Sequence, residues 1–157
     1  MRGFTLETGH PNELVGGKRP MHTLHSYIVT KPPTVPSLGS AESVAPNGSL
    51  LALGGTPGAH RQPQTNLQIL DAVLRSKADP QDALDMPRWA LDTKGKLHAE
   101  TREPNHLGKR LLAAGFTATP LAPWDGWTGR ACLALNSGKT IAAAYDLRGE
   151  GLAIVGQ

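Results

Sequence analysis

Short apolar runs, separated by stretches rich in glycine and proline, predict a chain of brief strands and helices. The triplet Tyr27-Ile28-Val29 predicts a strand within residues 21–30, and the apolar run Leu50–Leu53 is typical of a buried strand. Residues 31–48 lie between these runs and contain four prolines, which predicts a long loop. We expect the two strands to pair across that loop.

The middle of the chain predicts three helices, over residues 65–76, 80–85 and 105–114. The first has its apolar residues spaced for one face. The second begins with Asp79 as its N-cap and Pro80 at the first helical position. The third is followed by Gly115, which suits a C-cap. Its apolar residues are expected to point inward: Leu107, Leu111 and Leu112.

The C-terminal part of the chain predicts further short strands. Leu97–Ala99 and Phe116–Leu121 are candidates, and Ala131–Leu135 and Thr140–Tyr145 flank Asn136-Ser137-Gly138-Lys139, a hairpin signal. The order of two strands, then helices, then two strands predicts an α+β fold with antiparallel sheets and flanking helices. We expect one domain over residues 1–157.

Composition and charge indicate which kinds of binding partner to expect. The net charge is +3 and the pI is about 9.2, but the basic residues are scattered and no aromatic platform accompanies them, so we expect no nucleic-acid partner. No apolar stretch approaches the roughly 20 residues of a membrane span, and no signal-peptide pattern follows Met1. The single cysteine, Cys132, excludes an internal disulfide and is predicted to be a buried, unreactive thiol.

The stretch Gly54–Asn66 is the strongest candidate for chemistry. It connects a predicted strand to a predicted helix through three glycines, and such a turn exposes backbone N–H groups. These donors can hold a carboxylate, a phosphate or a developing oxyanion. The glycine spacing matches neither standard phosphate-binding motif. A tight connection without a ligand remains the alternative.

Other polar residues give weaker patterns. His22, His25 and His60 have no carboxylate or thiol at a familiar metal-ligand spacing, so we predict no metal and no cofactor. A relay of Ser26, His60 and Asp71 has no local support in the sequence. His22 and Thr23 stand at the start of a predicted strand, where an imidazole and a hydroxyl can bind a substrate carboxylate or lie unused on the surface.

Several motifs, in order, resemble the gamma-glutamyltranspeptidase family. The resemblance covers nearly the whole chain and is weaker toward the C-terminus. The matching segments are Gly3-Phe4-Thr5-Leu6-Glu7, Gly9-His10-Pro11-Asn12, Gly17–Thr23, Gly55–Ala59, Gln62-Pro63-Gln64, Leu67-Gln68, Asp82–Trp89, Gly129-Arg130-Ala131 and Asp146-Leu147-Arg148. The last departs from the family's usual Asp-Pro-Arg.

The resemblance implies an N-terminal-nucleophile hydrolase, a self-cleaving precursor with an αββα sandwich. Its nucleophile is the N-terminal threonine of the small subunit. Only the later part of that subunit is similar to this chain, which implies a partial sandwich. By family logic, the N–H groups of Gly58 and Ala59 form the oxyanion hole. His22 and Thr23 occupy the place of a serine pair that binds the glutamyl carboxylate, and this departure leaves the acyl group open.

We therefore expect a fragment of an acyltransferase or amide hydrolase that lacks its nucleophile. Its partners would be the large subunit or N-terminal portion of the same precursor and a small-molecule amide or acyl substrate. We expect His22 and Thr23 to line one cleft with the Gly58-Ala59 turn. The alternative is a non-catalytic module that uses this turn to bind an anion or a partner. The cellular compartment stays open.

Overall fold

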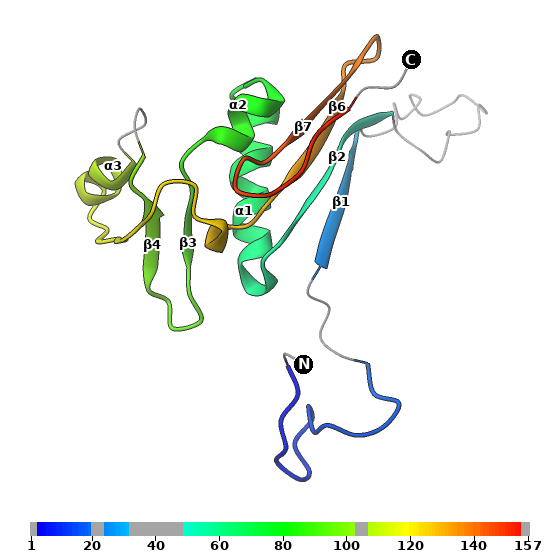
Figure 1. Cartoon of the computed structure of the whole chain (residues 1–157), viewed down its shortest axis with the longest axis vertical. Coiled ribbons are helices and arrows are strands. Elements are labelled where there is room, and N and C mark those ends of the chain that lie inside the picture. Colours follow the sequence, from blue (N-terminus) through cyan, green and yellow to red (C-terminus); the bar gives the residue numbers. More distant parts are fainter. Residues whose placement is uncertain (1–2, 20–23, 32–48, 103–106, 155–157) are drawn as a thin grey trace, which may run out of the picture.

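The computed structural model describes residues 3–19, 24–31, 49–102 and 107–154. Two sheets form the body, with helices packed around them (Figure 1). The first has four strands in the order β1-β2-β6-β7, and the second has three in the order β3-β4-β5. Residues 3–19 are irregular and lie beyond the start of β1, apart from both sheets in Figure 1. This mixed architecture confirms the predicted α+β class.

The four-stranded sheet is antiparallel throughout. Its strands are β1 (Leu24–Thr30), β2 (Leu50–Pro57), β6 (Cys132–Asn136) and β7 (Ile141–Tyr145). The predicted pairing of the first two strands and the predicted C-terminal hairpin are both confirmed. Leu51 is an extra residue in β2, because Val29 pairs with Ala52 and Thr30 with Leu50. Such a bulge increases the local twist of the strand.

β2 continues through the glycines that were predicted to form a turn. A Cβ at Gly54 would stand 2.5 Å from the Tyr27 hydroxyl, and one at Gly55 would stand 2.5 Å from the carbonyl oxygen of His25. The two glycines are therefore needed for close packing within the sheet. The prediction of a turn from Gly54 is wrong by four residues, because β2 ends at Pro57 and the chain turns at Gly58.

Helices cover one face of this sheet. α1 (Gln62–Leu70) begins three residues before the predicted start and runs into a π-helical turn, η2 (Asp71–Arg75). α2 (Pro80–Asp85) has the predicted bounds, and the Asp79 side chain accepts a hydrogen bond from the N–H of Gln81. The core between helices and sheet is aliphatic: Ala52, Ile69, Ala72, Val73, Ala83, Leu84, Ala131, Leu133 and Ala144. Within the described part of the chain, no helix has the length and apolarity to span a membrane.

The smaller sheet consists of β3 (Trp89–Leu91), β4 (Leu97–Glu100) and β5 (Thr119–Leu121). β3 and β4 are antiparallel, whereas β4 and β5 are parallel. α3 (Leu107–Ala113) connects the parallel pair, as such a pair requires a crossover. Leu112 is 67% exposed, so its predicted inward position is wrong.

No described helix covers the face of the large sheet opposite α1 and α2, and besides the strands themselves only the C-terminal segment 152–154 borders a hollow there. Cys132 is exposed there, which contradicts the predicted buried thiol. In a strand only every second side chain faces the helices, and Leu133 takes that position. The hollow has a volume of about 440 Å³. Its lining includes Leu53, Cys132, Ala134, Ala143, Leu152 and Ile154.

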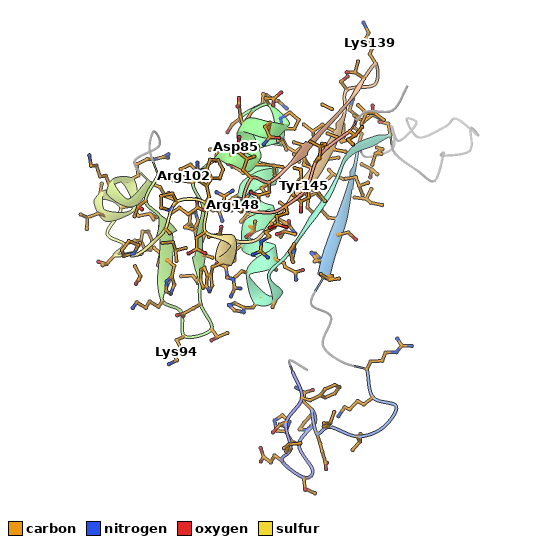
Figure 2. All side chains as sticks on the ribbon, viewed as in Figure 1. Asp85, Lys94, Arg102, Lys139, Tyr145 and Arg148 are labelled. Atoms are coloured by element: carbon orange, nitrogen blue, oxygen red, sulfur yellow. The ribbon has the colours of Figure 1, made fainter. Side chains whose placement is uncertain are left out.

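A buried ionic network joins the two sheets. Arg148 follows β7 and donates two hydrogen bonds to the carboxylate of Glu100 in β4. Its Nε lies 2.6 Å from Oε1, and its Nη2 lies 2.9 Å from Oε2. Arg148 also pairs with Asp146 at 3.0 Å, and Arg88 pairs with Asp146 at 2.6 Å. Arg102 is the fifth member, with its Nε 3.1 Å from Glu100. Figure 2 shows Arg102 and Arg148 between the two sheets.

Backbone groups complete the network. The carbonyl oxygen of Leu84 accepts hydrogen bonds from both Arg88 and Arg148. Burial raises the pKa of Asp146, but the Arg88 guanidinium and the N–H groups of Ala131 and Arg148 more than offset this effect. The pKa of Asp146 therefore lies below its ordinary value of 3.8.

The uncovered sheet face predicts self-association. Ile28 is 68% exposed and pairs across the sheet with Leu53, which is 46% exposed. Contiguous exposed apolar area of this kind drives association. We expect the mass measured by light scattering to rise with protein concentration. The double variant Ile28→Thr, Leu53→Thr should reduce this rise while keeping good strand formers.

Leu112→Thr is the matched control, because Leu112 is equally exposed but lies on α3. A strictly monomeric parent chain would contradict the prediction. An equal reduction by Leu112→Thr would mean that the self-associating surface is not the exposed face of the sheet.

The ionic network predicts a large penalty for removing one buried charge. Asp146→Asn leaves Arg88 and Arg148 without their shared carboxylate and should lower the free energy of unfolding by about 3–5 kcal/mol. The control Asp71→Asn breaks the exposed pair with Arg75 and should cost about 1 kcal/mol or less. Urea denaturation measures both changes.

The same carboxylate predicts a pH dependence. Because its pKa is lower in the folded chain, Asp146 contributes stability above pH 3.8 that is lost as the pH falls through its lower, folded-state pKa. The Asp146→Asn chain should lack this component in urea denaturation below pH 3.8. Parallel acid curves for the two chains would be inconsistent with this role.

Candidate active site at the corner of β2 and α1

The corner between β2 and α1 has an unusual backbone conformation. Gly58 has φ 145° and ψ 10°, and Ala59 has φ 52°. The chain then makes the 3₁₀ turn η1 (Ala59–Arg61), closed by a hydrogen bond from the N–H of Arg61 to the carbonyl oxygen of Gly58 at 3.1 Å. Two consecutive positive φ angles define a distinct local geometry for the N–H groups of this turn.

Gly58 and Ala59 differ in how well they suit this conformation. Glycine adopts positive φ without steric penalty. Alanine in the left-handed region brings its Cβ close to the following carbonyl, at about 1–2 kcal/mol. Such strain persists only where the surroundings over-determine the conformation, and it clusters at functional sites. Ala59 is therefore the residue at which the structure departs most from local preference in this corner.

The electrostatics of the corner favour an anion. The positive end of the α1 dipole lies here, and neither η1 nor the first turn of α1 contains an acidic residue. His60 and Arg61 are the side chains that follow the turn. The corner thus combines backbone donors with a positive local field.

Two polar contacts with residues 128–130 hold the corner in place. The N–H of Arg130 donates to Thr56 Oγ1 at 3.0 Å, and the hydroxyl of Thr65 donates to the carbonyl oxygen of Thr128 at 2.6 Å. Gly129 permits this approach, since a Cβ there would stand 2.4 Å from Thr56 Oγ1. One side of the corner is therefore fixed by a segment far away in the sequence.

The predicted carboxylate-binding residues, His22 and Thr23, lie outside the described residues. Leu24, the first residue of β1, pairs with Pro57, the last residue of β2. β1 therefore begins at the end of the sheet where the Gly58-Ala59 turn lies. That His22 and Thr23 share a cleft with the turn stays a prediction.

The other sequence candidates do not come together. No hydrogen bond or ion pair joins Ser26, His60 and Asp71 in the described structure, and Asp71 pairs instead with Arg75 at 3.0 Å. Among the described residues, no group of three His, Cys, Asp or Glu side chains is placed to hold a metal ion.

Sequence reasoning missed the residues that support the corner. Thr56, Thr65 and Thr128 have no motif that predicts their contacts, and the partners are 63 and 74 residues apart. Two family segments, Gly55–Ala59 and Gly129-Arg130-Ala131, contain residues of this support, but the resemblance assigned no supporting role to Thr56 or Arg130.

Comparison with known proteins agrees with the resemblance. The family model for gamma-glutamyltranspeptidase matches residues 1–156. The glutathione hydrolase-like YwrD proenzyme of Bacillus subtilis is 28% identical over 157 aligned residues, which cover 96% of this chain and 27% of that protein. The chain thus spans about a quarter of the length of this curated relative.

Solved structures share the fold. The gamma-glutamyltranspeptidase from Pseudomonas nitroreducens complexed with L-DON matches with a TM-score of 0.69 at 22% identity, over 95% of this chain and 70% of that chain. A cephalosporin acylase from Bacillus halodurans matches with a TM-score of 0.69 at 26% identity, over 93% of this chain and 25% of that chain.

These matches confirm the α+β fold of the N-terminal-nucleophile hydrolase type. The family model extends over almost the entire sequence, including the Gly58-Ala59 turn and all the residues of the buried ionic network. The chain belongs to the gamma-glutamyltranspeptidase family.

Proposed function

We propose that this chain supplies the oxyanion hole, and part of the substrate carboxylate site, of a gamma-glutamyltransferase-like acyltransferase or amide hydrolase. The observation that carries the proposal is the pair of positive φ angles at Gly58 and Ala59, in the family's motif and at the start of a helix. Strained backbone at a helix N-terminus without acidic residues in its first turn suits a site that stabilises developing negative charge.

The reaction would follow the family's chemistry. A threonine hydroxyl on the complementary part of the protein attacks the amide carbonyl, and its own α-amine takes the proton. The carbonyl oxygen becomes an oxyanion, which the N–H groups of Gly58 and Ala59 stabilise. The C–N bond then breaks as the α-ammonium returns the proton to the leaving amine, which leaves the acyl group as an ester on the threonine oxygen. Water or a second amine attacks this ester, its proton passes through the α-amine to the threonine oxygen, and the C–O bond to threonine breaks.

The substrate class follows from the same reasoning. His22 and Thr23 would bind a carboxylate on the acyl side, in the place of the family's serine pair. An imidazole and a hydroxyl present their donors with a different shape and spacing from two hydroxyls, so the acyl group need not be glutamyl. Similar proteins include a glutathione hydrolase-like protein and a cephalosporin acylase, whose names refer to two different amide substrates.

The proposal predicts that the chain alone does not hydrolyse amides and that a complementary part restores activity. In the described residues, the one Ser, Thr or Cys side chain hydrogen-bonded to a carboxylate is that of Thr128, and its partner Glu100 is held in ion pairs with Arg102 and Arg148. The other contacts of these side chains are with backbone groups and other hydroxyls, which cannot act as a base. Co-expression with a large subunit and a threonine-initiated segment from a relative should restore hydrolysis of an acyl anilide, measured by release of the aniline.

Replacing single amide bonds by esters tests the oxyanion hole in the restored complex. Glycolic acid at Gly58, or lactic acid at Ala59, removes one N–H and keeps the rest of the residue. Each ester should lower kcat by about 10²–10³, the usual effect of losing one oxyanion donor. Glycolic acid at Gly16 is the matched control, because Gly16 is exposed and belongs to the segment 3–19, which lies apart from both sheets in Figure 1. An unchanged kcat with the ester at Gly58 or Ala59 means that the turn binds an anion or a partner without acting in catalysis.

The strain at Ala59 generates a separate prediction about stability. Ala59→Gly removes the left-handed penalty of about 1–2 kcal/mol but adds about 0.4–1 kcal/mol of unfolded-state entropy. We expect a net gain of up to about 1.6 kcal/mol in the free energy of unfolding, measured by urea denaturation. Ala113→Gly, at the last residue of α3, has no left-handed penalty to remove and should instead lose up to about 1 kcal/mol. A loss in both variants would mean that Ala59 is not strained.

A further inference from the structure

Residues 125–130 form a short, self-supported turn beside the β2–α1 corner, which we name the brace. Asp125 caps η3 (Gly126–Thr128), since its Oδ1 accepts from the N–H of Trp127 at 2.9 Å. The N–H of Gly129 donates to the carbonyl oxygen of Gly126 at 3.1 Å. These two bonds lie within the brace and involve no residue of the corner.

Trp127 makes two separate contacts with Arg61, which follows the Gly58-Ala59 turn by two residues. Arg61 Nε donates to the carbonyl oxygen of Trp127 at 2.7 Å, across 66 residues of sequence. The guanidinium carbon of Arg61 also lies 4.3 Å from the centre of the Trp127 ring. The hydrogen bond ties the Arg61 side chain to the backbone of residue 127. The cation–π contact sets the plane of the Arg61 guanidinium against the indole ring.

The Trp127 ring is itself supported from the smaller sheet. The His98 ring of β4 lies 4.7 Å from it with an interplanar angle of 49°. His98 Nε2 is 3.2 Å from Asp92 Oδ2, and the N–H of Lys96, the largest influence, holds the pKa of Asp92 below its ordinary value. The indole thus links β4 to the first turn after β2.

We infer that Trp127 is a positioning residue for the Gly58-Ala59 turn. The link is η1, in which the N–H of Arg61 donates to the carbonyl oxygen of Gly58. Holding Arg61 therefore holds the peptide groups that precede it. Ala59 needs such external support, because its left-handed conformation is unfavourable on its own. The catalytic part of this inference rests on the proposed function, whereas the structural part does not.

The inference differs from simple packing of an aromatic side chain. A ring that only fills space would be replaced by another apolar residue with a general loss of stability and no local effect. A positioning ring requires a flat π-face for Arg61, so Trp127→Phe should retain most of its effect and Trp127→Leu should not.

The structural part is tested in the 157-residue chain by amide hydrogen exchange, read by NMR. Trp127→Leu should accelerate exchange at Gly58 and Ala59 by about ten-fold or more relative to the core of β6, because local opening becomes easier. Trp124→Leu is the matched control, since Trp124 stacks on Arg102 at 3.5 Å, in the ionic network. Equal exchange at the turn in both variants would overturn the inference.

A second variant covers the case in which Trp127→Leu does not fold. Arg61→Lys keeps the charge but loses the Nε donor and the planar group that covers the ring. It should reproduce the local acceleration at Gly58 and Ala59. Unchanged exchange in Arg61→Lys would also overturn the inference.

The catalytic part is tested in the restored complex by separating kcat from KM. Trp127→Leu should lower kcat by about 10- to 100-fold with little change in KM, because displaced donors mainly affect the transition state. Trp127→Phe should recover most of kcat. An active complex whose kcat is insensitive to Trp127→Leu would overturn this part. If no complex is active while the turn still loosens in Trp127→Leu, the proposed function fails and the positioning of the turn by Trp127 stands.

Discussion

The two-point contact between Arg148 and Glu100 is the interaction on which the arrangement of this protein depends. It connects the end of β7 to the end of β4, and both side chains are fully buried. A buried ion pair adds little net stability compared with apolar residues, but removing one partner is strongly unfavourable. The pair therefore selects one packing of the two sheets. Glu100 also accepts from the Thr128 hydroxyl at 3.0 Å, so the network is continuous with the support of the β2–α1 corner.

Local chemistry explains what the sequence could predict of the fold. The helix over Pro80–Asp85 depends on a cap and a proline within three residues, and the C-terminal hairpin depends on a four-residue turn. Both have the expected positions. β2 is longer than expected because Gly54 and Gly55 serve the sheet, where Tyr27 and His25 pack against them. Glycine favours a turn in isolation, and only tertiary contact reverses that preference.

The candidate site could be predicted only in part, for a similar reason. Gly58 and Ala59 were found through their resemblance to a family motif, whereas Trp127 and Arg61 meet across 66 residues and form no pattern in the sequence. The exposure of Cys132 was missed because the run Ala131–Ala134 is uniformly apolar. A uniform run suggests a strand covered on both faces, and in the described structure only one face is covered.

The contacts that position the Gly58-Ala59 turn lie within this chain, whereas the nucleophile of the proposed reaction would come from another part of the protein. The described contacts that hold the Gly58-Ala59 turn come from Thr56, Arg61 and the brace, all within this chain. Donors that are fixed before the substrate arrives need no reorganisation in the transition state, which is what makes an oxyanion hole effective. Under the proposed function, a threonine nucleophile supplied by another part of the protein would therefore meet a donor pair already in place. The uncovered sheet face and the turn belong to the same strand, β2, so docking of a second layer on that face would bring new groups to the strand that ends at the turn.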